Sequence, residues 1–547
     1  MLGSGNKPAL ETGYSMAPGA VSAVQPADHS RGGSAAAPQK RAKIWTISFF
    51  LIVAAGIFLR FYKLEHKEYW CDEAYTSLMI SGHTREQFRD TVCTGQPLLA
   101  KDLRREFQTP LGPTSGFIKD CIEMGGHHPP LYFLLARVWT ERFGSGVIAM
   151  RLLPALLSLL LLPAAYWLGL ELFRSTTVAR IAVILMAVSP NLVLHAQNAR
   201  EYSLWIALVA CTSAALLRAV RLQQKKYWLI YAVVNAVSLY TYSLSVFVSL
   251  AHCLSVFCTE KLRLTSVVKS QLQSTLLSFL LYSPWLVVMA CKRHVLEDMA
   301  WLDKKISLIK LVTGWKNGFT LIFAQVPDPW LQGSLSLGLL AIAVVVACVF
   351  LRRAQRRQVI FITCLTACSI LPLVVPDLVF GGFRSIITRY MMPAVIAVFL
   401  AFAFTISQML EAAARPIRAA GALLLAAMIG CGIASCIANT TLAIHPQFSI
   451  GEDLASMARI INSSPKPVMV CNVGSEPGQT LAAVRLLADG VPLLLSDGPQ
   501  IAPVPAECSE VYVFDPDPTK PFRIDPEFNV DRPAGMPFFG TLTRRGF

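Results

Sequence analysis

The chain has 547 residues, of which 54% are hydrophobic and only 15% charged, and its mean hydropathy is +0.50. Soluble domains carry a much larger share of charged residues, so this composition excludes an ordinary soluble protein and indicates a polytopic membrane protein. The net charge of +15 does not indicate nucleic-acid binding, because the lysines and arginines fall mostly in short links between apolar runs. That distribution is the positive-inside signal, and it also suits an anionic lipid surface.

Residues 1–43 are predicted to form a disordered, basic, cytoplasmic N-terminus. They are rich in Gly, Ala, Ser and Pro, lack apolar periodicity and end in Gln39-Lys40-Arg41-Ala42-Lys43. The run Ile44–Tyr62 follows, and it is long enough to cross the hydrocarbon core. No convincing small-residue cleavage site follows it, so we expect an anchor rather than a cleaved signal.

Residues 44–440 are predicted to hold about 11 membrane spans, with a basic cluster at every inner link. These spans are Ile44–Tyr62, Leu152–Phe173, Val178–Leu194, Ser203–Ala219, Trp228–Tyr242, Leu244–Phe257, Leu272–Ala290, Leu335–Leu351, Val359–Val375, Met391–Leu410 and Ala419–Ala438. The apolar segment Pro129–Phe143 is short and contains three charged residues, so we expect it to lie along the interface. Residues 63–149 then form one long outer loop, and residues 291–332 form another.

Residues 441–547 change in character and are predicted to form a small extracytoplasmic α/β domain. Pro467–Asn472 and Glu510–Asp515 are expected to be buried strands, with a helix over Leu481–Leu487 between them. Among the 14 cysteines there is no CxxC and no Cys/His cluster with zinc spacing. Two pairs are candidates for disulfides outside the cell, namely Cys93 with Cys121 and Cys471 with Cys508.

The predicted outer links collect the unusual polar residues of the chain. They are Asp72-Glu73, His127-His128, the segment from Gln197 through Arg200 to Tyr202, and the segment from Arg384 to Arg389-Tyr390. A carboxylate can take the proton from an attacking hydroxyl. An arginine fork matches phosphate oxygens, and the charge that builds on a departing phosphate needs such donors. These residue types on one face of the membrane predict transfer from a lipid-linked phosphate.

Each of these features also has a structural interpretation when it is taken alone. The acidic pair can be a solvated turn after a membrane span, and the two histidines can end a loop. Arg200 and Arg389 can snorkel to lipid headgroups, and Tyr202 and Tyr390 can be ordinary interfacial aromatics. Function is favoured only because all of them converge on one predicted face.

Trp70-Cys71-Asp72-Glu73-Ala74-Tyr75 resembles the W-x-D-E-A-Y motif in the first outer loop of bacterial GT-C glycosyltransferases of family 39, the protein O-mannosyltransferase-like kind. Further segments resemble later motifs of that family, in the family's order. They are His128–Phe133, Phe143-Gly144 with Arg151–Leu156, Ser189-Pro190 with Ala196–Leu204, Ser283–Trp285 and Arg389–Pro393. The resemblance covers roughly residues 45–410.

The resemblance implies an all-α polytopic membrane protein with a GT-C-like bundle, to which the small α/β domain is added. It implies an inverting transferase that uses a polyprenyl-phosphate sugar on the outer face. Asp72 carries over as the base, with Glu73 as its neighbour or a backup ligand; adjacent carboxylates rarely share one role. The remaining site residues carry over as donor-phosphate ligands (Arg200 and Arg389) and as pocket-lining groups (His127, His128, Gln197, Tyr202 and Tyr390).

No cofactor is required by this logic, since the arginines supply positive charge, although some relatives bind a divalent metal and that question stays open. The expected partners are the polyprenyl-phosphate sugar, membrane lipids and a lipid, glycan or protein acceptor. The chain departs from some relatives, which carry an acid in an A-x-x-D motif where this chain has Glu201 beside Arg200. The motifs name neither the sugar nor the acceptor.

Two other classes remain as alternatives. A transporter or flippase of lipid-linked sugars would need charges near mid-membrane and inverted repeats, and the predicted spans are almost free of internal charge. A non-catalytic membrane scaffold would not depend on Asp72. For the glycosyltransferase we expect a multi-pass protein of the plasma (inner) membrane, with its active site and C-terminal domain extracytoplasmic.

Overall fold

The computed structural model describes residues 36–110, 112, 114–123, 128–291, 302–326, 328–442, 453–473, 477–498, 504, 510–515, 523 and 528–544. Contacts divide the chain into the units Met1–Ser48 and Phe49–Phe547, and the site described below lies wholly in the second.

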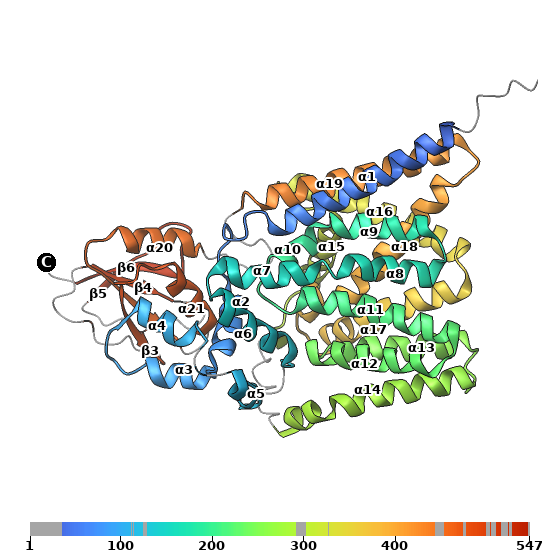
Figure 1. The fold of residues 1–547 in the computed structure, drawn as a ribbon. Coiled ribbons are helices and arrows are strands. Elements are labelled where there is room, and N and C mark those ends of the chain that lie inside the picture. Colours follow the sequence, from blue (N-terminus) through green and yellow to red (C-terminus); the bar gives the residue numbers. More distant parts are fainter. Residues whose placement is uncertain are drawn as a thin grey trace, which may run out of the picture. The chain divides into compact units, whose positions relative to one another are not determined.

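Thirteen helices coincide with the predicted apolar runs. They are α1 (Ala36–Phe61), α7 (Val147–Ser158), α8 (Leu161–Phe173), α9 (Thr176–Ala187), α10 (Pro190–Ala196), α11 (Tyr202–Leu222), α12 (Lys225–Thr241), α13 (Ser245–Thr259), α14 (Ser266–Cys291), α16 (Pro329–Arg353), α17 (Arg356–Val379), α18 (Met392–Leu410) and α19 (Arg415–Asn439) (Figure 1).

All eleven predicted runs are therefore helical, and the protein is a multi-pass membrane protein. Among the described residues, eight helical segments are long and apolar enough to cross a membrane. A ninth span is formed if α9 and α10, which meet at an angle of 61°, count as one broken span. The two remaining runs correspond to α12 and α13. These helices have 17 and 15 residues and are shorter than the nine other spans.

The bend between α9 and α10 has a local cause. Pro190 cannot donate a backbone hydrogen bond, and the Ser189 side chain caps α10 by accepting from the Leu192 amide. The carbonyls freed at the end of α9 are taken by the buried Arg60 guanidinium, which donates to the oxygens of Met186 (3.1 Å) and Ala187 (2.5 Å). A cation from α1 thus satisfies the backbone where the span breaks.

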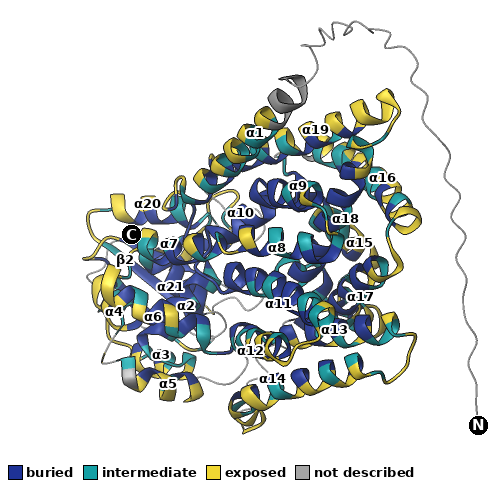
Figure 2. Cartoon of the chain, turned by 45° about the vertical axis from the view of Figure 1, so that its right-hand side comes forward, coloured by how far each residue is buried: buried dark blue, intermediate teal, exposed yellow. Residues whose placement is uncertain are grey.

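Burial separates central from peripheral helices. Figure 2 shows α9 and α11 largely buried, whereas α14 and α19 expose much of their surface. Large exposed apolar side chains mark the outer helices, among them Leu276 on α14 and Leu423 on α19. Apolar exposure of this kind fits a surface in contact with lipid.

The predicted outer loops contain more secondary structure than the sequence indicated. The first holds α2 (Cys71–Ser81), α3 (Arg85–Val92), β1 (Leu98–Leu99), α4 (Ala100–Phe107), α5 (Thr114–Glu123) and α6 (Leu131–Phe143). The second holds α15 (Leu308–Phe323), and the 3-10 turns η2 (Arg384–Ile386) and η3 (Thr388–Met391) precede α18. Helix α6 matches the short apolar segment that we expected not to cross the membrane. Helix α15 packs against η2, and a Cβ atom on Gly314 would collide with Ile386.

The C-terminal region forms a six-stranded mixed sheet with the order β1-β3-β2-β4-β6-β5. Its elements are α20 (Leu454–Ser463), β2 (Pro467–Asn472), α21 (Pro477–Leu486), β3 (Pro492–Ser496), β4 (Glu510–Phe514), β5 (Phe528–Asp531) and β6 (Phe539–Arg544). Strand β2 is parallel to β3 and β4, and the remaining pairs are antiparallel. The two predicted strands and the helix between them are confirmed, and β1 from the first outer loop extends the sheet.

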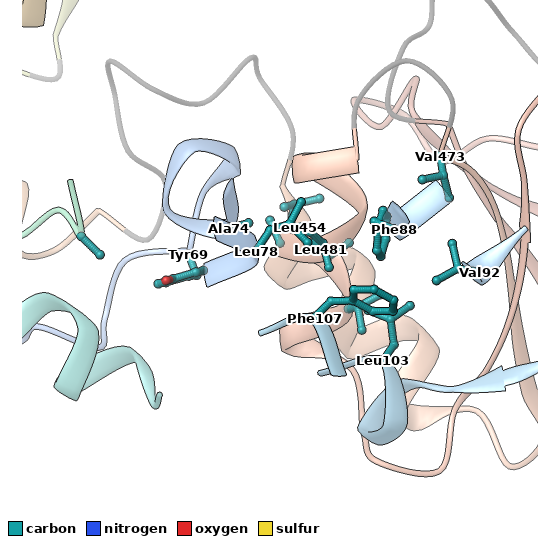
Figure 3. Close-up of a cluster of buried hydrophobic side chains, with 14 of the residues drawn as sticks. Tyr69, Ala74, Leu78, Phe88, Val92, Leu103, Phe107, Leu454, Val473 and Leu481 are labelled. Carbon is teal, nitrogen blue, oxygen red and sulfur yellow. The ribbon is translucent and has the colours of Figure 1, made fainter. Parts of the chain in front are cut away.

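One hydrophobic core joins the outer loop to the C-terminal region. Ala74 and Leu78 of α2 and Phe107 of α4 pack with Leu454 of α20 and Leu481 of α21 (Figure 3). The predicted boundaries at residues 63–149 and 441–547 remain predictions, but the two segments are packed together. Of the candidate disulfide cysteines, Cys93 and Cys121 are free thiols and do not form the predicted pair. The pairing of Cys471 with Cys508 stays a prediction, because Cys508 lies outside the described residues.

Candidate active site

Helix α2 begins at the acidic pair. Asp72 and Glu73 lie in its first turn, where a negative charge is favoured by the helix dipole. The Glu73 side chain also accepts a hydrogen bond from the Trp70 amide, 3.4 Å away, and so caps the helix. The helix ends at Gly82, whose positive φ of 93° suits a glycine after a helix. Trp70 and Glu73 of the motif therefore also form the N-terminal cap of this helix.

Glu73 is completely buried in an ion pair. Its carboxylate oxygens Oε1 and Oε2 accept from Nε and Nη2 of Arg151 at 2.8 and 2.6 Å, which is the bidentate geometry that an arginine fork favours. The same guanidinium donates to the carbonyl oxygens of Leu64, Lys67 and Glu68 at 2.7 to 2.9 Å. Glu73 and Arg151 thus tie the segment before α2 to the start of α7.

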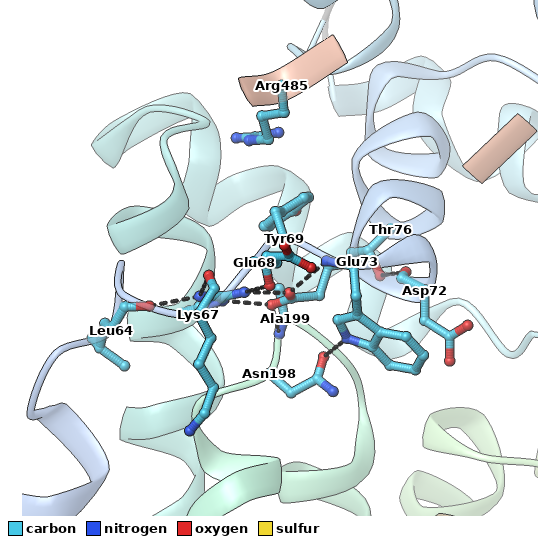
Figure 4. A network of polar contacts seen from close by, with 12 residues as sticks. Leu64, Lys67, Glu68, Tyr69, Asp72, Glu73, Thr76, Asn198, Ala199 and Arg485 are labelled. Carbon is cyan, nitrogen blue, oxygen red and sulfur yellow. Dashed lines mark hydrogen bonds and ion pairs between the residues drawn. The ribbon is translucent and has the colours of Figure 1, made fainter. Parts of the chain in front are cut away.

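The Glu73 carboxylate also holds the segment between α10 and α11. Its Oε1 atom accepts from the Ala199 amide at 2.8 Å, and the indole of Trp70 donates to Oδ1 of Asn198 at 3.1 Å. Figure 4 shows Glu73 turned into this network and the Asp72 carboxylate directed away from it. Neighbouring acids in the chain therefore occupy different environments.

Asp72 is partly accessible, with 22% of its side chain exposed, and it faces Arg389. The Arg389 Nη2 atom lies 3.5 Å from Asp72 Oδ2, so the pair is in Coulombic contact without a tight bidentate bond. The Arg389 guanidinium also lies over the rings of Trp70 and Tyr390, at 5.5 and 5.3 Å from their centroids. These aromatic faces hold the cation next to a carboxylate that remains available.

Arg200 also contacts α2, through the helix backbone and a hydroxyl side chain. Its Nη1 atom donates to the Asp72 carbonyl oxygen and to the Thr76 hydroxyl, both at 3.3 Å, and its Nη2 atom donates to Glu201 at 3.1 Å. The His128 Nδ1 atom lies 3.7 Å from the same Glu201 oxygen. Burial raises the pKa of the Glu201 carboxyl, and the nearby Arg200 guanidinium opposes that rise.

Several buried polar atoms around Glu201 have no hydrogen-bond partner within the described part of the chain. They are Oε2 of Glu201, Nε of Arg200, Nδ2 of Asn198 and the hydroxyl of Tyr132. Buried polar groups are normally satisfied by protein, water or ligand. This group contains both donors and an acceptor, so it is suited to a ligand that carries hydroxyl groups.

The remaining predicted site residues have different surroundings. The Gln197 amide donates to the carbonyl oxygens of Leu59 and Tyr62 and so ties this segment to the end of α1. Tyr202 is buried next to Arg200, and the Arg200 guanidinium carbon lies 5.7 Å from the centroid of the Tyr202 ring. His127 lies outside the described residues. Asp72, His128, Arg200, Tyr202, Arg389 and Tyr390 are brought together, as the convergence on one predicted face indicated.

Three residues of the site were not selected from the sequence. Arg151 and Trp70 lie inside the motifs, but nothing in the pattern showed that Arg151 pairs with Glu73 or that Trp70 contacts Asn198 and Arg389. Glu201 was noted only as a departure from relatives. Within the described ranges, no set of three or more His, Cys, Asp and Glu side chains is placed to hold a metal ion.

Comparison with known proteins bears on the fold. Residues 127–288 match the model of the dolichyl-phosphate-mannose-protein mannosyltransferase family, and none of the curated proteins matches the chain. Among solved structures, apo ArnT from Cupriavidus metallidurans superposes with a TM-score of 0.52 at 13% identity, covering 92% of this chain and 98% of that chain. ArnT from the same organism bound to undecaprenyl phosphate gives a TM-score of 0.50 with the same identity and coverage. This chain has the ArnT fold.

The ArnT fold confirms the GT-C-like bundle with a small sheet region at its C-terminus that the sequence motifs led us to expect. The matched family segment begins at His127 and so includes the motif segment His128–Phe133, the segment Arg151–Leu156 and Arg200. It also includes the later motif segment Ser283–Trp285. The family resemblance seen in the motifs is thus supported by an independent sequence match and by the fold.

Proposed function

We propose that this chain is an integral-membrane glycosyltransferase that moves a sugar from a polyprenyl-phosphate donor to an acceptor hydroxyl with inversion. The observation that carries the proposal is the pairing of a partly exposed carboxylate, Asp72, with Arg389 at 3.5 Å beside Arg200, on the ArnT fold. Its fold relative was crystallised with undecaprenyl phosphate. The family model that matches residues 127–288 is named for a dolichyl-phosphate-mannose donor.

In the proposed reaction Asp72 takes the proton of the acceptor hydroxyl as that oxygen attacks the anomeric carbon of the donor sugar. The bond from the anomeric carbon to the phosphate oxygen breaks, and its electron pair leaves on the polyprenyl phosphate. Arg389 and Arg200 stabilise the charge that develops on this leaving group. A single displacement inverts the anomeric configuration.

The charge balance of the cluster suits this sequence of events. Two cations, Arg200 and Arg389, face two carboxylates, Asp72 and Glu201, so the charges of these four side chains balance, with His128 beside them. A donor phosphate that binds Arg389 competes with Asp72 for the guanidinium. Asp72 is then released from its ion pair and can accept a proton.

The unpartnered atoms around Glu201 supply the proposed sugar subsite. A sugar offers several hydroxyls that both donate and accept, and Glu201 Oε2, Asn198 Nδ2 and the Tyr132 hydroxyl are buried without partners in the described part of the chain. His128 flanks Glu201 at the less buried side of this group, with 22% of its side chain exposed. We assign these residues to the sugar and the two arginines to the phosphate.

An apolar cavity of about 250 Å³ is suited to part of the isoprenoid tail. It lies between α8 and α11 and is lined by residues that include Trp167, Leu204 and Cys211. Leu204 lies in the first turn of α11, the helix that begins at Tyr202. We place the site on the extracytoplasmic face of the plasma membrane, with lipid, glycan or protein as acceptor classes.

The direct test is a transfer assay with the purified protein in detergent or nanodiscs. Radiolabelled undecaprenyl-phosphate sugars, both hexoses and pentoses, are supplied with membrane lipid, glycan and peptide acceptors. Formation of a labelled product with release of undecaprenyl phosphate supports the proposal. If no donor reacts, but lipid-linked sugar moves across vesicles that contain the protein, the chain is a flippase; if neither occurs, it is a scaffold.

A further inference from the structure

The C-terminal domain reaches the helix that carries Asp72. Helix α21 packs along α2, and a Cβ atom on Gly478 would lie 2.6 Å from the Tyr75 ring and 2.7 Å from Cys71 Sγ. Cys71 and Tyr75 flank Asp72 on α2, one residue before it and three residues after it. The domain therefore supports the catalytic helix directly.

Arg485 of α21 lies at the junction of four segments. Its Nη1 atom donates to Gln108 Oε1 at 3.0 Å and to Ser77 Oγ of α2 at 3.4 Å. Its Nη2 atom donates to the Ser145 carbonyl oxygen, and its guanidinium lies over the Tyr69 ring at 4.2 Å from the centroid. Figure 4 shows Arg485 above Tyr69, on the side away from Asp72.

Tyr69 transmits this contact to the start of α2. The ring is buried, its hydroxyl bonds to Ser77 Oγ at 2.7 Å, and it immediately precedes Trp70, the cap of the helix. Arg151, which holds Glu73, also lies by the Tyr69 ring, at 5.7 Å from its centroid. The start of α2 is therefore fixed by contacts from α7 and from the C-terminal domain.

We propose that Arg485 is a positioning residue that holds α2, and with it the Asp72 carboxylate, in the geometry that transfer requires. This inference rests on the proposed function of Asp72. A shift of about 1 Å at a reacting group can cost on the order of a hundredfold in rate. Arg485 bonds to Gln108, Ser77 and the Ser145 carbonyl and lies over Tyr69, so we expect its loss to act through the position of α2 rather than by removing a donor-phosphate ligand.

The test compares Arg485→Met with Arg459→Met, a control on the exposed face of α20 whose guanidinium donates to Ser456 of the same helix. Hydrogen exchange of residues 69–81 is measured together with kcat and the donor KM. We expect Arg485→Met to lower kcat about tenfold or more, to leave the donor KM within about twofold, and to accelerate exchange in α2. Arg485→Lys keeps a cation over Tyr69 without the fork and should be intermediate, whereas the control should match wild type.

The proposal is overturned if Arg485→Met leaves kcat and exchange in α2 unchanged, or if it raises the donor KM at constant kcat. Should Arg485→Met fail to fold, Arg485→Lys decides, because it keeps a cation near the Tyr69 ring and removes the fork that bonds to Gln108, Ser77 and Ser145. This variant should accelerate exchange in α2 and lower kcat about threefold, and wild-type values for both would refute the proposal. Hydrogen exchange can be measured whether or not the protein is a transferase. If wild type shows no transferase activity but the Arg485 variants accelerate exchange in α2, the proposed function is refuted and the role of Arg485 in holding α2 is not.

Discussion

Replacing Arg151 by methionine leaves a fully buried carboxylate without its partner. The Glu73 side chain has no solvent exposure, and removal of one member of such an ion pair costs about 3–5 kcal/mol. The carbonyl oxygens of Leu64, Lys67 and Glu68 lose a donor as well, at a cost on the order of 1 kcal/mol each. We therefore expect Arg151→Met to lower the free energy of unfolding by at least about 4 kcal/mol, a large part of a typical protein's stability.

Two companion variants separate folding from chemistry. Adding Glu73→Gln to Arg151→Met removes the unpaired charge and keeps an acceptor for the Ala199 amide, so about 2 kcal/mol should be regained. Asp72→Asn changes a partly exposed side chain and should alter stability by less than about 0.5 kcal/mol. The assay is unfolding in detergent, followed by the reactivity of the buried cysteines. The reasoning is refuted if Arg151→Met is as stable as wild type, or if the double variant is no better than Arg151→Met.

Three further outcomes are expected. Arg389→Lys keeps the charge beside Asp72 but loses the fork, so kcat/KM for the donor should fall about tenfold or more, and an unchanged value would remove Arg389 from the phosphate site. Arg60→Met leaves the carbonyl oxygens at the bend between α9 and α10 without donors, so the free energy of unfolding should fall by roughly 2–3 kcal/mol. Thermal unfolding should show this loss for Arg60→Met and no loss for the control Arg352→Met, since Arg352 is exposed. Burial raises the pKa of Glu68 from 4.5 to about 7, so its contribution to stability is present below pH 4.5 and lost as pH rises through 7. Thermal unfolding should show wild type less stable at pH 8 than at pH 5, by at most about 3 kcal/mol, and Glu68→Gln should reduce that difference.

The site residues that lie together could be predicted from the sequence, because the membrane topology determines which links between spans share one face. Asp72, Arg200 and Arg389 are far apart in the chain, but the order of apolar runs and basic links assigned all three to one face. The structure brings them into contact. The separate role of Glu73 was not predictable, since its partner Arg151 lies 78 residues away, beside an apolar run where an arginine usually snorkels.

Other features depend on tertiary packing that has no local signal. Strand β1 is only Leu98–Leu99 and lacks an alternating pattern, yet it pairs with β3 at the edge of the C-terminal sheet. Gln197 was expected to line the pocket from its place in a motif, whereas its amide is engaged by the backbone at the end of α1. The contact of Arg485 with Tyr69 joins the outer loop to the C-terminal domain. These two regions were predicted separately from the sequence, because no local pattern links them.

The most direct test of the account is transfer of labelled sugar from a polyprenyl-phosphate donor by wild type and Asp72→Asn at equal amounts of folded protein. Asp90→Asn, on the exposed face of α3, is the matched control. The account predicts that Asp72→Asn loses at least about a hundredfold in rate, equivalent to about 2.7 kcal/mol of barrier, while the control keeps full activity. Wild-type rates in Asp72→Asn would contradict the assignment of this carboxylate as the base.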